Sequence, residues 1–146
     1  SYRQILKALD LCPVDIPARE EARYQLQPAD LMGQKLDGLL MASPSNPTGT
    51  MLSRDELAAL MGWAESEGAA FISDEIYHGL HYGDRAVSAL EISDEAYVIN
   101  SFSKYFSMTG WRIGWIIGPK DAIERILNLS TVNTYAMESS GTTFLM

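Results

Sequence analysis

The fold is decided by residues 39–75, which read LLMASPSNPTGTMLSRDELAALMGWAESEGAAFISDE. Residues 39–42 form a continuous apolar run, typical of a strand covered on both faces, and residues 69–73 indicate a second buried strand. Between them, residues 43–49 contain two prolines and a glycine, which predict a loop. A strand, a helix and a strand in this order predict a βαβ unit, with parallel strands and a right-handed connection.

The helix between the two strands is the clearest element in the sequence. Ser53 and Glu56 have the spacing of a capping box, in which each side chain satisfies a free amide of the first turn. Gly68 stands where a left-handed C-cap is expected. Apolar residues recur between these ends at helical spacing, at Leu57, Leu60, Met61 and Ala64.

Strand and helix patterns continue on both sides of this unit. Helices are expected over residues 2–9 and 28–33 and from Gly118-Pro119 onward, and strands over residues 12–17, 97–99 and 112–117. Pro13 and Pro17 weaken the first of these strands, because proline cannot donate to a sheet ladder. The whole pattern predicts an α/β fold with a mostly parallel sheet and helices on both faces.

The composition argues against several classes of protein. The 146 residues carry 19 acidic and 11 basic side chains, a formal net charge of −8, and such an acidic chain is not expected to bind nucleic acid. No apolar run reaches the roughly 18 residues that a membrane-spanning helix needs, so no membrane partner is expected. Cys12 is the only cysteine, so no internal disulfide is possible, and the cytoplasm is the expected compartment.

Asn46, Asp74 and Lys104 each come shortly after a predicted strand. In open α/β sheets, ligands bind beyond the carboxyl ends of the strands, so this shared placement indicates a site. A lysine directly after a buried strand is expected to be partly desolvated, which favours the neutral amine that Schiff-base chemistry needs. Taken alone, a lysine at such a position is usually a solvated surface residue.

The residues around Lys104 are suited to binding a phosphate. Hydroxyl donors and the planar guanidinium fork of an arginine are provided by Ser101, Ser103, Ser107, Thr109 and Arg112. The plainer alternative is that the hydroxyls cap the end of the strand and that Arg112 forms a surface ion pair.

Asp74 and Tyr77 project to the same side if a helical turn begins after the strand. A carboxylate facing a pyridine nitrogen keeps that nitrogen protonated, and a phenol can donate to a phenolate oxygen on the same ring. Asn46 presents an amide donor from a loop stiffened by Pro44 and Pro47. The alternatives are that Asp74 caps a short helix and that Asn46 hydrogen-bonds its own backbone in a turn.

His78 and His81 are spaced i, i+3, but neither an H-E-x-x-H sequence nor a cysteine-rich partner accompanies them. No metal is therefore expected, and both are interpreted as loop histidines. The G-x-G-x-x-G and Walker patterns of nucleotide-binding α/β proteins are also absent from the sequence.

Four motifs, taken together and in this order, resemble the class I/II aminotransferases of pyridoxal 5′-phosphate (PLP) fold type I, and the aspartate-aminotransferase-like branch in particular. The motifs are Ser45-Asn-Pro-Thr-Gly49, Asp74-Glu-Ile-Tyr77, Ser101-Phe-Ser-Lys104 and Gly110-Trp-Arg-Ile-Gly114. The resemblance implies a PLP-dependent enzyme that transfers an amino group between an α-amino acid and a 2-oxo acid.

The resemblance also implies a role for each matching position. Lys104 is the Schiff-base lysine and moves the proton between the substrate Cα and the cofactor. Asp74 pairs with the pyridine nitrogen, while Tyr77 and Asn46 hydrogen-bond the 3′ oxygen of the ring. The remaining cofactor contacts are to the phosphate, from Ser101, Ser103 and Arg112.

This sequence departs from the family at both ends. The family's phosphate loop and ring-stacking aromatic precede the position of Ser1, and the small domain, with the arginine that grips the substrate carboxylate, lies beyond Met146. Residues 1–146 are therefore expected to be part of the PLP-binding large domain, with little transaminase activity in isolation. The family's active site is shared across a dimer, so a homodimer is implied.

Two further functions share these motifs. A PLP-dependent C–S β-lyase has the same fold, because the cofactor supplies the carbanion chemistry and the pocket chooses its outcome. The non-enzymatic alternative is the aminotransferase-like sensing domain of a transcriptional regulator, which a basic DNA-binding segment elsewhere in the gene product would support.

Overall fold

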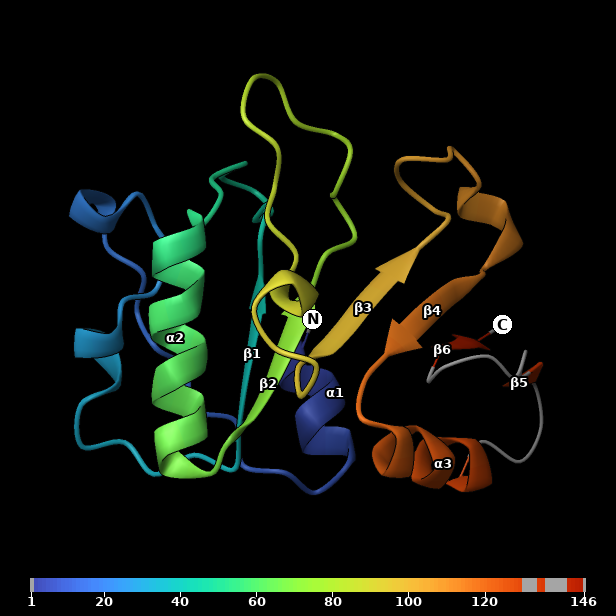
Figure 1. Ribbon diagram of the computed structural model, residues 1–146, viewed down its shortest axis with the longest axis horizontal. Coiled ribbons are helices and arrows are strands. Elements are labelled where there is room, and N and C mark those ends of the chain that lie inside the picture. The colour runs from blue at the N-terminus through green and yellow to red at the C-terminus, as the bar shows by residue number, and fades with distance from the viewer. Residues whose placement is uncertain (1, 130–133, 136–141, 146) are drawn as a thin grey trace.

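The computed structural model describes the backbone of residues 2–129, 134–135 and 142–145, which form one sheet with helices beside it (Figure 1). The strands are β1 (Gly38–Ala42), β2 (Ala70–Asp74), β3 (Tyr97–Ser101), β4 (Gly114–Ile117), β5 (Thr134–Tyr135) and β6 (Thr142–Leu145). The α-helices are α1 (Tyr2–Ala8), α2 (Arg54–Glu67) and α3 (Lys120–Leu129). Short 3-10 helices are η1 (Glu20–Ala22), η2 (Pro28–Leu31), η3 (Ala89–Glu91) and η4 (Thr109–Trp111). The predicted α/β class is confirmed.

The sheet is parallel in one half and antiparallel in the other. In the order β1-β2-β3-β4-β6-β5, the pairs β1–β2 and β2–β3 are parallel, and the pairs that follow are antiparallel. The mostly parallel arrangement predicted from the sequence therefore holds only for β1 to β3. The physical reason is the connection from β3 to β4, which contains only η4, whereas a parallel return needs a longer crossover, usually an α-helix.

The caps of α2 are those that the sequence predicts. The Ser53 hydroxyl accepts a hydrogen bond from the Glu56 amide at 3.3 Å, and the Ser53 amide donates to the Glu56 carboxylate at 2.8 Å. Gly68 ends the helix in the left-handed region, at φ +68°. The helix start and end, and with them the register of its buried face, are fixed by these local interactions.

The core lies on one face of the parallel half of the sheet. Leu39, Phe71 and Val98, one from each parallel strand, are at most 6% exposed. They belong to one cluster with the buried side chains of α2, which are Leu57, Leu60, Met61 and Ala64. On the opposite face Ile99 is 37% exposed, and α1 contributes no buried residue. The expectation of strands covered on both faces is thus wrong for the described residues, because α1 is short and leaves that face partly open.

The other sequence predictions have mixed outcomes. The helix expected over residues 2–9 is α1, and the helix expected over residues 28–33 is the shorter η2. Residues 12–17 form no strand, which agrees with the inability of Pro13 and Pro17 to donate to a ladder. The strand expected over residues 112–117 begins two residues later, because Arg112 adopts a left-handed conformation, at φ +54°.

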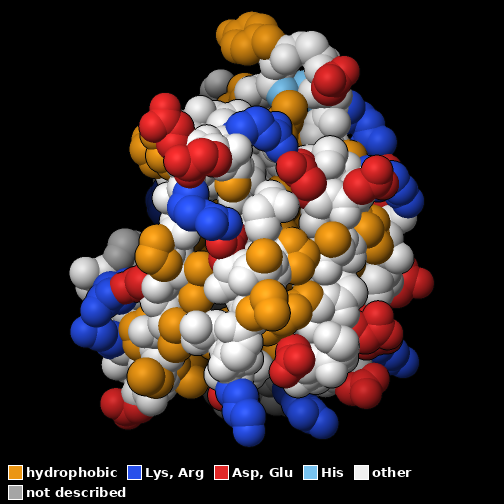
Figure 2. Space-filling model, turned by 90° about the vertical axis from the view of Figure 1, so that its left-hand side faces the viewer, with side chains coloured by type: hydrophobic (Ala, Val, Ile, Leu, Met, Phe, Trp, Pro, Cys, Tyr) orange, Lys and Arg blue, Asp and Glu red, His pale blue; other side chains and the backbone are white. Residues whose placement is uncertain are grey.

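Charged side chains of both signs are interspersed on the face that carries α2 and the N-terminal loops (Figure 2). Ion pairs on the surface include Arg23 with Glu56 at 2.7 Å and Arg85 with Glu91 at 2.7 Å. The Arg85 hydrogen bond, followed by that of the Ser88 amide, lowers the pKa of Glu91 to about 2. None of the helices in the described residues has the length and apolar character that crossing a bilayer requires.

Replacing Glu56 with glutamine tests the charge at the start of α2. The Ser53 amide and then Arg23 lower the pKa of the Glu56 carboxyl from its ordinary value of 4.5. A lowered pKa gives stability that is complete above 4.5 and is lost as the pH falls through the folded-state pKa. We expect Glu56→Gln, which keeps an oxygen for the Ser53 amide, to cost less than about 1 kcal/mol at pH 7 and nothing at acid pH.

The measurement is the free energy of unfolding by urea at a series of pH values. Arg23→Gln is the matched control, because it removes the partner and should reproduce part of the same pH dependence. A cost of Glu56→Gln that stays constant from pH 7 to acid pH would contradict this account.

Candidate active site at the carboxyl edge of the sheet

The loops that follow β1, β2 and β3 lie at the same edge of the sheet (Figure 1). Asn46 lies in the loop after β1, Asp74 ends β2, and Lys104 follows β3 by three residues. The predicted placement after a strand is confirmed for Asn46 and Lys104, whereas Asp74 is the last residue of its strand. Because parallel strands end at one edge, residues distant in sequence can meet there.

Asn46 and Tyr77 are brought into direct contact. The Asn46 side-chain amide donates a hydrogen bond to the Tyr77 hydroxyl, with 3.1 Å between nitrogen and oxygen. Since the Tyr77 oxygen accepts this bond, its own proton is available to a ligand, and the Asn46 amide keeps a second N–H. The pair is therefore suited to donate two hydrogen bonds to one anionic oxygen.

Asp74 is held by two donors from different parts of the chain. One carboxylate oxygen accepts from the Ile76 amide at 3.1 Å, and the other accepts from the Tyr2 hydroxyl of α1. Among the described residues, no lysine, arginine or histidine comes within ion-pair distance of Asp74. The carboxylate is thus half-buried, oriented and free of a cationic partner, which suits it to a cationic group of a ligand.

Tyr2 is a site residue that sequence reasoning missed. Burial, and then the hydrogen bond to Asp74, raise the pKa of its phenol well above the ordinary value, so the phenol is a proton donor at neutral pH. Tyr2 lies 72 positions before Asp74. No spacing rule connects residues so far apart, and only the packing of α1 against the sheet edge brings them together.

Lys104 approaches the same group of residues from the β3 loop. Its Nζ atom lies 5.7 Å from the centre of the Tyr77 ring, a cation–π arrangement. The side chain is exposed, so the partial desolvation expected from the sequence is not observed. The reason is that Lys104 lies in a loop whose next residues, Tyr105 to Ser107, are exposed as well.

The candidate phosphate residues form a loop that is closed on itself. The Ser101 hydroxyl accepts from the Ser103 amide at 3.1 Å, and the Thr109 hydroxyl donates to the Ser103 carbonyl at 2.7 Å. Arg112 donates to the Thr109 carbonyl at 3.0 Å and keeps its other N–H groups toward solvent. Thr109 thus joins the serines to Arg112, and hydroxyl and guanidinium donors remain for an anion.

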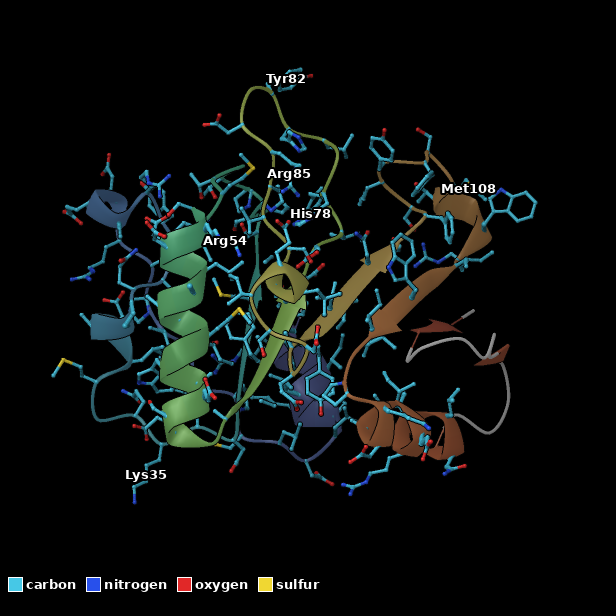
Figure 3. All side chains as sticks on the ribbon, viewed as in Figure 1. Lys35, Arg54, His78, Tyr82, Arg85 and Met108 are labelled. Carbon is cyan, nitrogen blue, oxygen red and sulfur yellow. The ribbon has the colours of Figure 1, made fainter. Side chains whose placement is uncertain are left out.

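A cavity of about 460 Å³ opens beside Asn46 and Tyr77. It is lined mainly by the β1 loop and by the residues after Tyr77, including Leu80, His81 and Tyr82. Tyr82 is fully exposed and points away from the molecule at the tip of its loop (Figure 3). The buried Nδ1 atom of His81, a residue of the cavity wall, has no hydrogen-bond partner among the described residues.

The two histidines considered as metal ligands have different surroundings. His78 contacts Glu75 and the Ser43 carbonyl, whereas His81 lines the cavity. Within residues 2–129, 134–135 and 142–145, no three His, Cys, Asp or Glu side chains come together in an arrangement that could hold a metal ion.

Gly79, in the turn after Tyr77, lies against Tyr105 of the Lys104 loop. Its φ is +88°, and a Cβ atom at this position would overlap the ring of Tyr105, the neighbour of Lys104. We expect Gly79→Ala to destabilise the protein by about 1–3 kcal/mol, through backbone strain and displacement of Tyr105. The measurement is urea unfolding, with Tyr105→Ala added to relieve the overlap and leave only the backbone strain.

Gly62 is the matched control, because it lies in α2 and a Cβ atom there would meet nothing within 4 Å. Gly62→Ala should stabilise the protein by about 0.5–1 kcal/mol. If Gly79→Ala behaved like Gly62→Ala, the turn and the Lys104 loop would not be in contact.

Comparison with known proteins finds similarity over nearly the whole chain. A model of the family described as aminotransferase class I and II matches residues 1–145. A valine–pyruvate aminotransferase of Mycobacterium tuberculosis is 44% identical over 124 residues, which cover 81% of this chain and 31% of that relative. An aspartate aminotransferase of Streptomyces avermitilis is 36% identical over 139 residues, covering 90% of this chain and 34% of that relative.

A solved structure of similar fold comes from Silicibacter pomeroyi, and it is described provisionally as an aminotransferase. It is 58% identical, with a TM-score of 0.86, over 89% of this chain and 35% of that one. This chain therefore spans about a third of the length of the relatives that it matches.

Proposed function

The chain belongs to the class I and II aminotransferase family, and from that premise we propose that it is part of a PLP-dependent aminotransferase. Its reaction is the transfer of an amino group between an α-amino acid and a 2-oxo acid. Residues 1–146 form part of the PLP-binding large domain, and the cytoplasm is the proposed compartment.

The observation that carries the proposal is the meeting of three complementary groups at one sheet edge. These are the Asn46–Tyr77 donor pair, the unpaired carboxylate of Asp74 and the amine of Lys104. PLP presents a phenolate oxygen, a pyridine nitrogen and an aldehyde on one ring, so the donor set matches the cofactor group by group. The residues present therefore fit PLP chemically.

Asp74 and Tyr2 act on the pyridine end of the site. Asp74 would pair with the protonated ring nitrogen, for which the described part of the chain provides no competing cation. The Tyr2 hydroxyl and the Ile76 amide fix both carboxylate oxygens, so Asp74 meets the ring without reorganising. When bound, the cofactor supplies the electron sink that stabilises negative charge at the substrate Cα.

Tyr77 and Asn46 would donate together to the phenolate oxygen, and Lys104 would provide the amine for the cofactor aldehyde. The neutral Nζ atom of Lys104 would also be the base that accepts the proton from the substrate Cα. The exposed amine over the Tyr77 ring has the freedom of movement that this transfer needs. The phosphate would be held by Ser101, Ser103 and Arg112.

Trapping the cofactor on its lysine tests the proposal. The protein at its full natural length is incubated with PLP, reduced with borohydride, and mapped by peptide mass spectrometry. We expect one dominant adduct, on Lys104, that is lost in Lys104→Ala and in Lys104→Arg, because the Lys104 amine lies beside the donor set, over the Tyr77 ring. Lys35, at the opposite end of the molecule from the site (Figure 3), serves as the internal control. Adducts spread evenly over Lys7, Lys35 and Lys120 would sink the proposal.

The products formed from amino acids separate transamination from the lyase alternative. With an α-amino acid alone, a transaminase gives one equivalent of 2-oxo acid and leaves the amino group on the cofactor. A C–S β-lyase releases ammonia and turns over repeatedly on sulfur amino acids. Cofactor retention without either product would favour the sensing-domain alternative.

We further propose that the protein is a homodimer joined near Lys104. The support is a group of exposed aromatic side chains, since Tyr105, Phe106 and Trp111 are 55%, 48% and 69% exposed. Aromatic side chains gathered on a surface are typical of protein interfaces. We expect Trp111→Asp to weaken dimerisation at least about tenfold in sedimentation velocity, because a charge would be buried. Met32→Asp, at a residue that is 79% exposed and follows the last residue of η2, is the control and should leave the dimer unchanged.

A further inference from the structure

Glu75 is a buried carboxylate that the proposed chemistry does not use. It is 3% exposed, and it projects away from Asp74 because neighbouring residues at a strand end point to opposite faces. One oxygen accepts hydrogen bonds from the Ser73 hydroxyl at 3.1 Å, the Ser88 hydroxyl at 3.1 Å and the Ala89 amide at 2.8 Å. The Glu75 amide also donates to the Ile99 carbonyl of β3 at 2.8 Å. Glu75 is therefore fixed to the core by both its backbone and its side chain.

His78 connects this anchor to the loop after β1. Its Nδ1 atom lies 3.4 Å from the second carboxylate oxygen of Glu75, and its Nε2 atom lies 2.9 Å from the Ser43 carbonyl. A carbonyl oxygen only accepts, so Nε2 donates to it, and Nδ1 attracts the carboxylate oxygen when Nδ1 carries a proton as well. Figure 3 shows His78 among the loops at the carboxyl edge of the sheet.

Ser43 is itself held on the core side. It is 5% exposed, and its hydroxyl accepts from the Leu52 amide at 3.0 Å, which closes the loop that carries Asn46. Within the loop, the Ser45 amide donates a hydrogen bond to the Thr50 carbonyl at 3.0 Å. A hydrogen bond to the Ser43 carbonyl therefore positions the loop as one unit rather than a single residue.

We propose that Glu75 and His78 form a clasp that sets the distance between the Asn46 loop and the Tyr77 turn, so that both donors converge on one ligand oxygen. The two residues flank Tyr77 in sequence, one fixed to the core and the other to the base of the Asn46 loop. Asn46 is exposed and its hydrogen bond to Tyr77 is open to solvent, whereas the clasp adds a part-buried link between His78 and Ser43. Both residues are positioning residues, since neither reaches the donor pair. This inference rests on the proposed PLP site.

The burial of a charge supports a positioning role. Taking a carboxylate out of water is unfavourable unless its oxygens are hydrogen-bonded, and an apolar pair would pack here without that penalty. An apolar side chain at position 78, however, could not donate to the Ser43 carbonyl. Glu75 and His78 can therefore hold the Asn46 loop and the Tyr77 turn at a defined separation, which apolar side chains could not do.

The test compares two polar replacements of His78 in the protein at its full natural length. His78→Gln places an amide N–H near the position of Nε2 and keeps the donor to Ser43. His78→Asn is one methylene shorter, keeps a donor toward Glu75 and does not reach Ser43. Hydrogen exchange of the apo protein is measured for the amides of residues 43–52 and, as a folding control, of α2. The dissociation constant for PLP is measured on the same samples by fluorescence.

We expect His78→Asn to raise exchange of the Ser45 and Gly49 amides at least about tenfold and to weaken PLP binding about tenfold, with α2 unchanged. His78→Gln should stay within about threefold of the unsubstituted protein in both measurements. Equal behaviour of the two variants would overturn the clasp, and so would faster exchange in α2, which would mean that His78 stabilises the whole fold. Failure of the unsubstituted protein to bind PLP would instead overturn the proposed function, while the exchange data still decide whether the clasp holds the loop.

Discussion

The parallel register of β1, β2 and β3 is the constraint on which the rest of the structure depends. Ala42 pairs with Asp74, and Asp74 pairs with Ile99, so β1 and β2 end at one level and β3 continues two residues further, to Ser101. The hydrogen-bond ladder continues past the ends of β1 and β2. The Ser43 amide donates to the Asp74 carbonyl at 3.3 Å, and the Glu75 amide donates to the Ile99 carbonyl at 2.8 Å. A slip by one residue would turn Asp74 into the core and Glu75 to the open face, because side chains alternate along a strand.

This alternation gives the neighbours Asp74 and Glu75 different tasks with the same chemical group. Asp74 points to the open face, where Tyr2 and the Ile76 amide orient a carboxylate that has no cationic partner among the described residues. Glu75 points into the core, where hydroxyl and amide donors and His78 occupy its oxygens. The residue that we propose to contact the cofactor, Asp74, thus lies on one side of the sheet edge. The residue that we propose to position the loops, Glu75, lies on the other side, one peptide unit away.

The sequence predicted the parts of this arrangement that depend on local rules. The α2 caps at Ser53 and Gly68 follow from interactions within a few residues, and the strand ends that carry Asn46, Asp74 and Lys104 follow from apolar runs. Tyr2 escaped prediction because its contact with Asp74 depends on how α1 packs. The antiparallel direction of β4 and the exposure of Lys104 escaped it for a related reason, since direction and coverage of a strand are tertiary properties.

Relatives that share this part of the fold are named for valine–pyruvate and for aspartate aminotransferases, whose amino acids differ as much as a branched aliphatic group differs from a carboxylate. A common structure can serve both if its residues address the cofactor rather than the substrate side chain. In the PLP site that we propose, Asp74, Tyr77, Asn46 and Lys104 would all address the cofactor, which fits that division. Holding such a ring requires donors with fixed separations, and the ends of hydrogen-bonded strands are the most rigid places from which to present them.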